Sequence, residues 1–112
     1  MASKENDDIY NEFYEKVNMT PSELEKWLET EESKSSGQGS ENGQSIGYKS
    51  GKKIIKIKRT KKENLKEVDY KHMSKVNSYI ARHSAQKPEG DISKTTWRYS
   101  LKNWGFDPLK NK

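Results

Sequence analysis

The sequence predicts an all-α protein, a small bundle of about five short helices in a single domain of 112 residues. Several segments place apolar residues three and four positions apart, which is the spacing of a helix face. No two segments share the alternation of apolar and polar residues that a β-hairpin requires. Only 29% of the residues are hydrophobic, but eleven aromatic side chains are enough to build one small core.

The first helix is expected at about residues 8–17, where Asp7 or Asp8 can cap its N-terminus. The apolar residues that recur at helical spacing in this segment are Tyr10, Phe13, Tyr14 and Val17. Its aromatic face is therefore expected to enter the core.

The second helix is expected at about residues 21–32. Thr20 and Glu23 have the spacing of a capping box, and Pro21 suits the first helical position. The apolar stripe that follows consists of Leu24, Trp27 and Leu28. We expect the first two helices to form a helical hairpin.

A Gly/Ser-rich loop is expected from Ser33 to Ser50, because this stretch shows no helical spacing. The third helix then covers about residues 51–62, with Ser50 as its N-cap and Ile54 on its inner face. The alternation around Ile55 would also suit an edge strand, but the sequence offers no matching partner strand, so a helix is favoured.

The fourth helix is expected at about residues 66–84, and its inner face carries Met73, Val76 and Ile80. A turn follows at KPEGD. The fifth helix starts near Ser93 and ends before Gly105, and its apolar stripe consists of Trp97, Leu101 and Trp104. Residues 1–6 are expected to be a disordered tail, and residues 110–112 a C-terminal tail.

Charge is distributed unevenly along the chain. Residues 1–33 carry ten acidic and three basic residues, whereas residues 34–112 carry seven acidic and nineteen basic residues. This asymmetry indicates nucleic acid or another polyanion as partner, although an acidic part that folds back on a basic part would also explain it. The absence of cysteine, of a membrane-length apolar run and of a signal-peptide pattern favours a cytoplasmic protein, nucleoid-associated if bacterial.

Two of the expected helices carry basic residues at helical spacing. Ser50 and Gly51 would also lie at a helix N-terminus, where free N–H groups and the helix dipole favour a phosphate. The candidate phosphate contacts are Lys49, Ser50, Gly51, Lys52, Lys53, Lys56, Arg59, Lys71, Lys75 and Arg82. Solvated helix faces also carry lysines, so an ordinary exposed surface is the alternative.

Catalysis has little support in the sequence. His72 and His83 are the two histidines, and neither is matched to a nucleophile or a carboxylate pair, so we expect no enzyme, no metal and no cofactor. GYKSGKK resembles a phosphate-binding loop, but its glycine spacing is one residue short and no strand precedes it. WRYSLKNWGF interleaves aromatic and basic residues, as in proteins that stack single-stranded bases, but the spacing of Trp97, Leu101 and Trp104 favours core packing.

Four segments together resemble a known family: WLETEESKSSGQ, SIGYKSGKKIIKI, DYKHMSKVNSYIARHSAQKPEGD and WRYSLKNWGFDP. They are similar to the family catalogued as domain of unknown function 3140, over about residues 10–109. Its members are often labelled DNA-binding proteins, and the resemblance implies the same here without a mechanism. It also implies order on both sides of the expected loop, leaving about Gly39 to Gly43 mobile.

The sequence thus predicts a non-catalytic DNA-binding protein of low sequence specificity, with DNA favoured over RNA. The alternative is a protein-interaction module whose basic face docks an acidic protein partner. The acidic N-terminal hairpin would either pack against the domain or compete with DNA. If it competes, deletion of residues 1–19 should tighten DNA binding.

Overall fold

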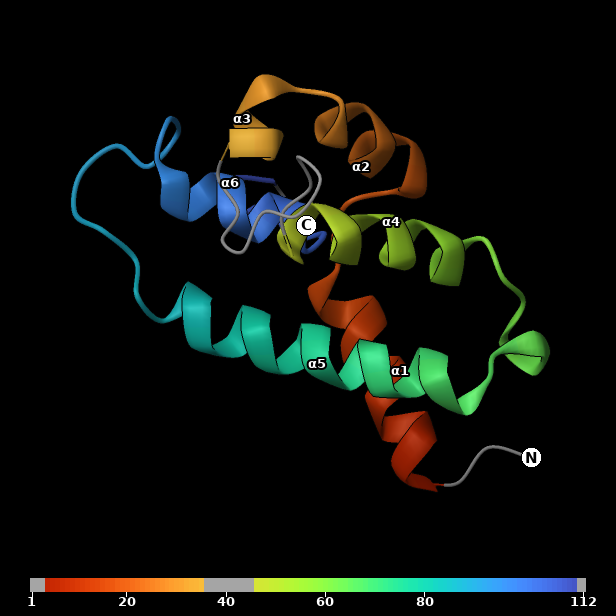
Figure 1. Cartoon of the computed structure of the whole chain (residues 1–112). Coiled ribbons are helices and arrows are strands. Elements are labelled where there is room, and N and C mark those ends of the chain that lie inside the picture. The colour runs from red at the N-terminus through yellow and green to blue at the C-terminus, as the bar shows by residue number, and fades with distance from the viewer. Residues whose placement is uncertain (1–3, 36–45, 111–112) are drawn as a thin grey trace.

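The computed structural model describes residues 4–35 and 46–110. Over these ranges the protein is all-helical, as predicted, with α1 (Lys4–Lys16), α2 (Pro21–Leu28), α3 (Glu31–Ser35), α4 (Ile46–Lys58), the 3₁₀ turn η1 (Lys62–Asn64), α5 (Glu67–Ser84) and α6 (Thr96–Asn103). Helices α4 and α5 run antiparallel, α1 crosses behind α5, and α2 and α3 lie above α4 (Figure 1). No helix within the described ranges is long and apolar enough to cross a membrane.

One apolar core joins these helices. Phe13, Leu24, Ile54 and Met73 come from four different helices, and each is completely buried. Trp104 closes the same cluster next to α6. The predictions that the first helix contributes an aromatic residue to the core, and that Ile54 and Met73 lie on inner faces, are therefore confirmed.

The start of α2 is as predicted, but its end is not. The Thr20 hydroxyl accepts a hydrogen bond from the Glu23 N–H, and the Glu23 carboxylate accepts one from the Thr20 N–H. The helix ends at Leu28 instead of continuing to residue 32. Thr30 starts a new short helix, α3, because its hydroxyl accepts from the Ser33 N–H.

The segment predicted as a loop from Ser33 to Ser50 is helical at both ends, which corrects that prediction and agrees with the order that the family resemblance implied for its flanks. The expected mobile residues, Gly39 to Gly43, lie outside the described residues. Helix α4 begins at Ile46, so the prediction that Ser50 caps a helix is wrong, and α4 ends at Lys58 instead of residue 62.

Close packing explains why α4 includes glycines that normally interrupt helices. A Cβ atom on Gly51 would lie 2.8 Å from the Asn103 carbonyl oxygen and 2.8 Å from Leu28 Cδ2. Glycine in a helix costs about 1 kcal/mol relative to alanine, and here the tight contact of α4 with α2 and α6 outweighs that cost.

Two smaller boundary predictions, the starts of α1 and α6, are also wrong. Helix α1 begins at Lys4, inside the expected tail. Lys110, at the other expected tail, donates a hydrogen bond to the Asn18 carbonyl at 2.6 Å. Helix α6 starts at Thr96 because the Thr95 hydroxyl caps it by accepting from the Arg98 N–H.

Candidate nucleic-acid interface

A buried hydrogen bond joins α4 to α5. Ser50 Oγ and His72 Nε2 are 3.0 Å apart, and Ser50 is only 3% exposed. The His72 ring also stacks on Trp104, with 6.2 Å between ring centroids and 15° between the planes. His72 therefore lies at the junction of α4, α5 and the end of α6.

The pKa of His72 depends on burial and on the charged residues around this junction. Burial lowers the pKa of His72 to about 4, and the positive charges of Lys53 and Lys75 contribute to this decrease. The hydrogen bond with Ser50 and the charge of Asp69 act in the opposite direction with smaller effect. The imidazole is neutral at physiological pH, and ammonium groups from α4 and α5 both act on it.

The outer surfaces of α4 and α5 carry exposed basic residues. Helix α4 contains no acidic residue, and its lysines at positions 49, 53 and 56 follow helical spacing. Within the described ranges, Lys53 and Lys56 form no ion pair, and Lys52 lies over the Tyr48 ring at 5.2 Å. We call the exposed basic residues on these two helices the outward cations: Lys49, Lys52, Lys53, Lys56, Lys71, Lys75 and Arg82.

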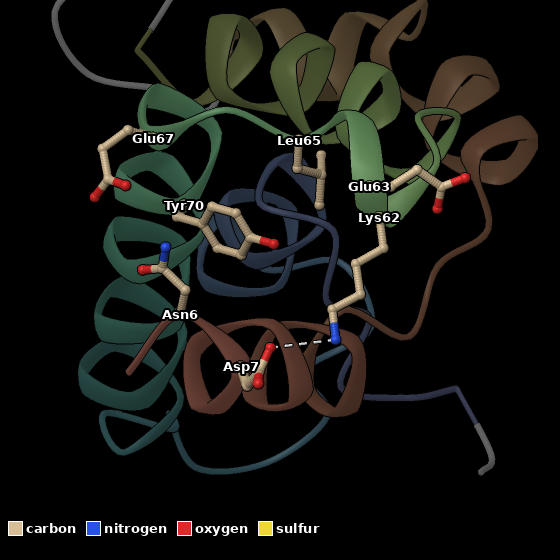
Figure 2. Close-up of a pocket in the computed structure, with 7 residues that line it drawn as sticks. All are labelled: Asn6, Asp7, Lys62, Glu63, Leu65, Glu67 and Tyr70. Carbon is tan, nitrogen blue, oxygen red and sulfur yellow. Dashed lines mark ion pairs between the residues drawn. The ribbon is translucent and has the colours of Figure 1, made fainter. Parts of the chain in front are cut away.

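Three basic residues at the end of α4 and just after it contact the N-terminal part of the chain. Arg59 pairs with Glu25 at 3.2 Å, and Lys62 pairs with Asp7 at 3.3 Å (Figure 2). Lys58 donates to the Met19 carbonyl at 2.9 Å, and burial lowers the pKa of Lys58. We call Lys58, Arg59 and Lys62 the paired cations.

Three of the predicted phosphate contacts do not belong to the exposed surface stripe. Ser50 and Gly51 are buried inside α4, one full turn from its start, so the predicted anion site at a helix N-terminus is wrong. Arg59 is exposed but faces Glu25 instead of joining the stripe of Lys52 and Lys56. The sequence could not reveal this pairing, because Glu25 and Arg59 are distant in the chain.

Sequence reasoning also missed the Ser50–His72 pair. A serine hydroxyl within hydrogen-bond distance of a histidine is the arrangement of an activated nucleophile. Here Ser50 is buried in the middle of a helix, and a histidine with a pKa of about 4 is a weak base at neutral pH. The geometry therefore fits a structural tie between two helices better than a catalytic pair.

A cavity of about 550 Å³ lies between α1, η1 and the start of α5. Figure 2 shows Lys62 reaching across it to Asp7, with Glu63, Glu67 and Tyr70 around the same space. No group of three or more side chains suited to a metal ion is found among the described residues. Because both signs of charge line this cavity, it is a poor match for a polyanion.

A second cavity, of about 690 Å³, lies between the N-terminus of α4, the C-terminal half of α5 and α6. We call it the aromatic cleft; it is lined by Ile46, Gly47, Lys75, Tyr79, Arg82, His83, Gln86, Thr96, Trp97, Ser100, Asn103 and Trp104. Leu101 and Trp104 are buried as predicted, but Trp97 is only partly buried and lines this cleft. The Trp97 indole N–H donates to the His83 carbonyl at 2.7 Å.

The chain matches the family described as "Protein of unknown function (DUF3140)" over residues 12–102. The chain belongs to this family. No curated protein and no solved structure matches it. The resemblance seen in the sequence is thus confirmed for membership in DUF3140, while DNA binding stays a prediction.

In this DUF3140 member, three of the four segments that carry the resemblance meet in one buried network. Asn103 Oδ1 accepts from Trp27 Nε1 at 2.7 Å and from Ser33 Oγ at 2.6 Å, and Asn103 Nδ2 donates to the Ser33 carbonyl at 3.2 Å. A Cβ atom on Gly47 would lie 3.1 Å from Asn103 Nδ2. This network holds α2, α3, α4 and α6 together, and none of the outward cations takes part in the hydrogen bonds named here.

Proposed function

We propose that this protein binds DNA without catalysis and with low sequence specificity, holding phosphates with the outward cations. One observation carries the proposal: α4 contains no acidic residue, and its exposed Lys53 and Lys56 form no ion pair with any residue in the described ranges. Helix α5 packs against α4 and carries the exposed Lys71, Lys75 and Arg82, so basic residues on two neighbouring helices are available to a phosphate backbone.

The surroundings of these lysines also favour a polyanion. No acidic residue occurs in α4, and the carboxylates of Glu25 and Asp7 engage Arg59 and Lys62 instead. Helix α5 carries Glu67 and Asp69 in its first turn, before its exposed basic residues, so positive charge is in excess over the two helices taken together. Such an excess attracts polyanions and steers their approach. A polyanion that neutralises these groups releases its counterions, which supplies the free energy of binding.

Low sequence specificity follows from the kind of side chain involved. All the outward cations except Arg82 are lysines, which present a point charge on a flexible stem. Contacts of this kind to phosphates fix position but do not read base edges. We therefore expect duplexes of equal length and different sequence to bind with the same affinity.

Fluorescence anisotropy with a short labelled duplex, at salt concentrations between about 50 and 200 mM, tests the proposal. If six of the outward cations contact phosphates, the logarithm of the affinity should fall linearly with the logarithm of salt concentration, with a slope of about −5. A scrambled duplex should give the same line. Absence of binding at the lowest salt would overturn the proposal and favour the alternative, an acidic protein partner on the same face.

A further inference from the structure

The aromatic cleft has the size and lining of a ligand site. Its volume of about 690 Å³ lies inside the range of roughly 300–1,000 Å³ that is typical of small-molecule sites. It is bordered by Lys75 and Arg82, which also belong to the outward cations. A ligand in the cleft could therefore stay connected to a phosphate backbone on the outer face of α5.

The rings that line the cleft form a near-parallel series. Tyr79 stacks on Trp104 with 4.3 Å between centroids and 14° between planes, and on His83 with 5.1 Å and 19°. Trp97 continues the series beyond His83 at 6.4 Å and 24°. A planar aromatic ligand can extend such a series, because ring faces aligned in one direction present a stacking surface to it.

The polar groups of the cleft suit an anionic ligand with a hydrogen-bonding edge. None of the residues that line the cleft is acidic, and two are cationic. His83 Nε2 is buried and has no hydrogen-bond partner in the part of the chain that the structure describes. Because this nitrogen is enclosed by protein, the cations Lys75 and Arg82 are the polar groups that we assign to ligand contact.

We propose that the aromatic cleft accepts an unpaired nucleobase of single-stranded DNA, while Lys75 and Arg82 hold the phosphates on either side of it. The two cations are seven residues apart, or about 10 Å along the helix axis, so they can contact different phosphates. This inference rests on the proposed function, since the same face of α5 must bind the backbone.

Two strands with the same number of phosphates test the cleft: an oligothymidylate and an abasic strand of equal length. Because stacking of a base on aromatic side chains strengthens binding, the oligothymidylate should bind about tenfold more tightly at equal salt. Equal affinity for the two strands would overturn the inference and leave the proposed function intact. Failure of both strands and of the duplex to bind would overturn both.

Two variants assign the base preference to the cleft. Trp97→Leu removes the outermost ring and should reduce the preference for oligothymidylate to about twofold or less. Ile46→Glu places a carboxylate at the rim of the cleft, where Ile46 is 53% exposed, and keeps the test decisive if Trp97→Leu does not fold. Leu109→Glu is the matched control, because Leu109 is 47% exposed and lies outside the cleft lining.

The preference for oligothymidylate should survive in Leu109→Glu and disappear in Ile46→Glu. Loss of the preference in both variants would show that net charge alone determines it, and would overturn the inference. A competition experiment gives a second way to overturn the inference. If an acidic peptide containing tryptophan displaces the oligothymidylate and free thymidine nucleotide does not, the cleft binds a protein ligand instead of a base.

Discussion

The outward cations and the paired cations follow one another on the chain, but their surroundings differ. Lys53 and Lys56 form no ion pair with any residue in the described ranges. Arg59 and Lys62 have the same spacing of three residues, and each meets a carboxylate from the acidic N-terminal helices. The acidic part of the chain therefore pairs with Arg59 and Lys62 but not with Lys53 or Lys56.

This difference shows that a count of basic residues does not measure the charge that is available to a partner. Both ion pairs are about half exposed, with side-chain exposures between 46% and 56%. Exposed pairs of this kind contribute about 0–1 kcal/mol to stability, so their larger consequence here is where positive potential remains. Under the proposed function, this potential lies on the outer faces of α4 and α5.

The largest expected effect comes from reversing charge in the two groups separately. Lys53→Glu with Lys56→Glu should weaken binding of a DNA duplex on the order of 100-fold and make the salt slope shallower by about two. Both side chains are exposed on α4, so the free energy of unfolding should stay within about 0.5 kcal/mol of the wild type. Anisotropy and urea denaturation measure the two quantities.

The matched control is Arg59→Glu with Lys62→Glu, which changes net charge by the same amount at the same spacing. These substitutions place carboxylates beside Glu25 and Asp7, so they should lower stability by about 1 kcal/mol through repulsion. Duplex affinity should fall less than about fivefold, since only the long-range field changes. Equal loss of affinity in the two double variants would remove the distinction between outward and paired cations.

The sequence predicted the parts of the fold that depend on local pattern. The capping box at Thr20 and Glu23, the buried Ile54 and the inner face of α5 all follow from spacing within one helix. The start of α4 does not, because Gly47 and Ser50 have the local signature of a loop and a helix cap. Their helical conformation depends on contacts with Asn103 and His72, which are distant in sequence.

The candidate site was predictable to the same extent. The lysines of α4 and α5 that form the outward cations follow from helical spacing within each helix. The pairing of Arg59 with Glu25 and the position of Trp97 in the cleft depend on how helices pack. No local signal in the sequence contains that information, although the excess of acidic residues before position 33 indicated that some pairing would occur.

The next prediction uses His72 to compare one cation from each group. The charge of Lys53 lowers the pKa of His72, so Lys53→Gln should raise this pKa by about half a unit. Arg59 is not among the residues whose charge affects His72, so Arg59→Gln should leave the pKa unchanged. NMR titration of the His72 ring protons measures both values. An equal response to the two substitutions would contradict the separation of the two groups.

The same pKa fixes the sign of a pH effect on stability. The pKa of His72 is about 4 in the folded protein against an ordinary value of 6.5, so the unfolded chain binds the proton first on acidification. His72 therefore stabilises the fold above pH 6.5, and this contribution is lost as the pH falls from 6.5 to about 4. Because Lys53→Gln raises the pKa of His72 in the folded protein, the free energy of unfolding should decrease less between pH 6.5 and about 4 in this variant than in the wild type. Urea denaturation at the two pH values measures this difference.

The smallest expected effect comes from releasing a paired cation. Glu25→Gln frees Arg59 to face solvent and should raise duplex affinity about twofold, with a stability change below about 1 kcal/mol. This substitution is a cleaner test than deletion of residues 1–19, which would remove Phe13, Val17 and Met19 from the core and so unfold the protein.

The matched control for Glu25→Gln is Glu29→Gln, an equal change of charge at an exposed residue one turn further along, at the C-terminal cap of α2. Glu29 does not pair with Arg59, so its substitution should change duplex affinity by less than about 1.3-fold through the long-range field alone. If both substitutions raised affinity equally, the carboxylate of Glu25 would act only through net charge. A larger rise for Glu25→Gln would mean that the acidic helices limit DNA binding by holding Arg59 away from the outward cations.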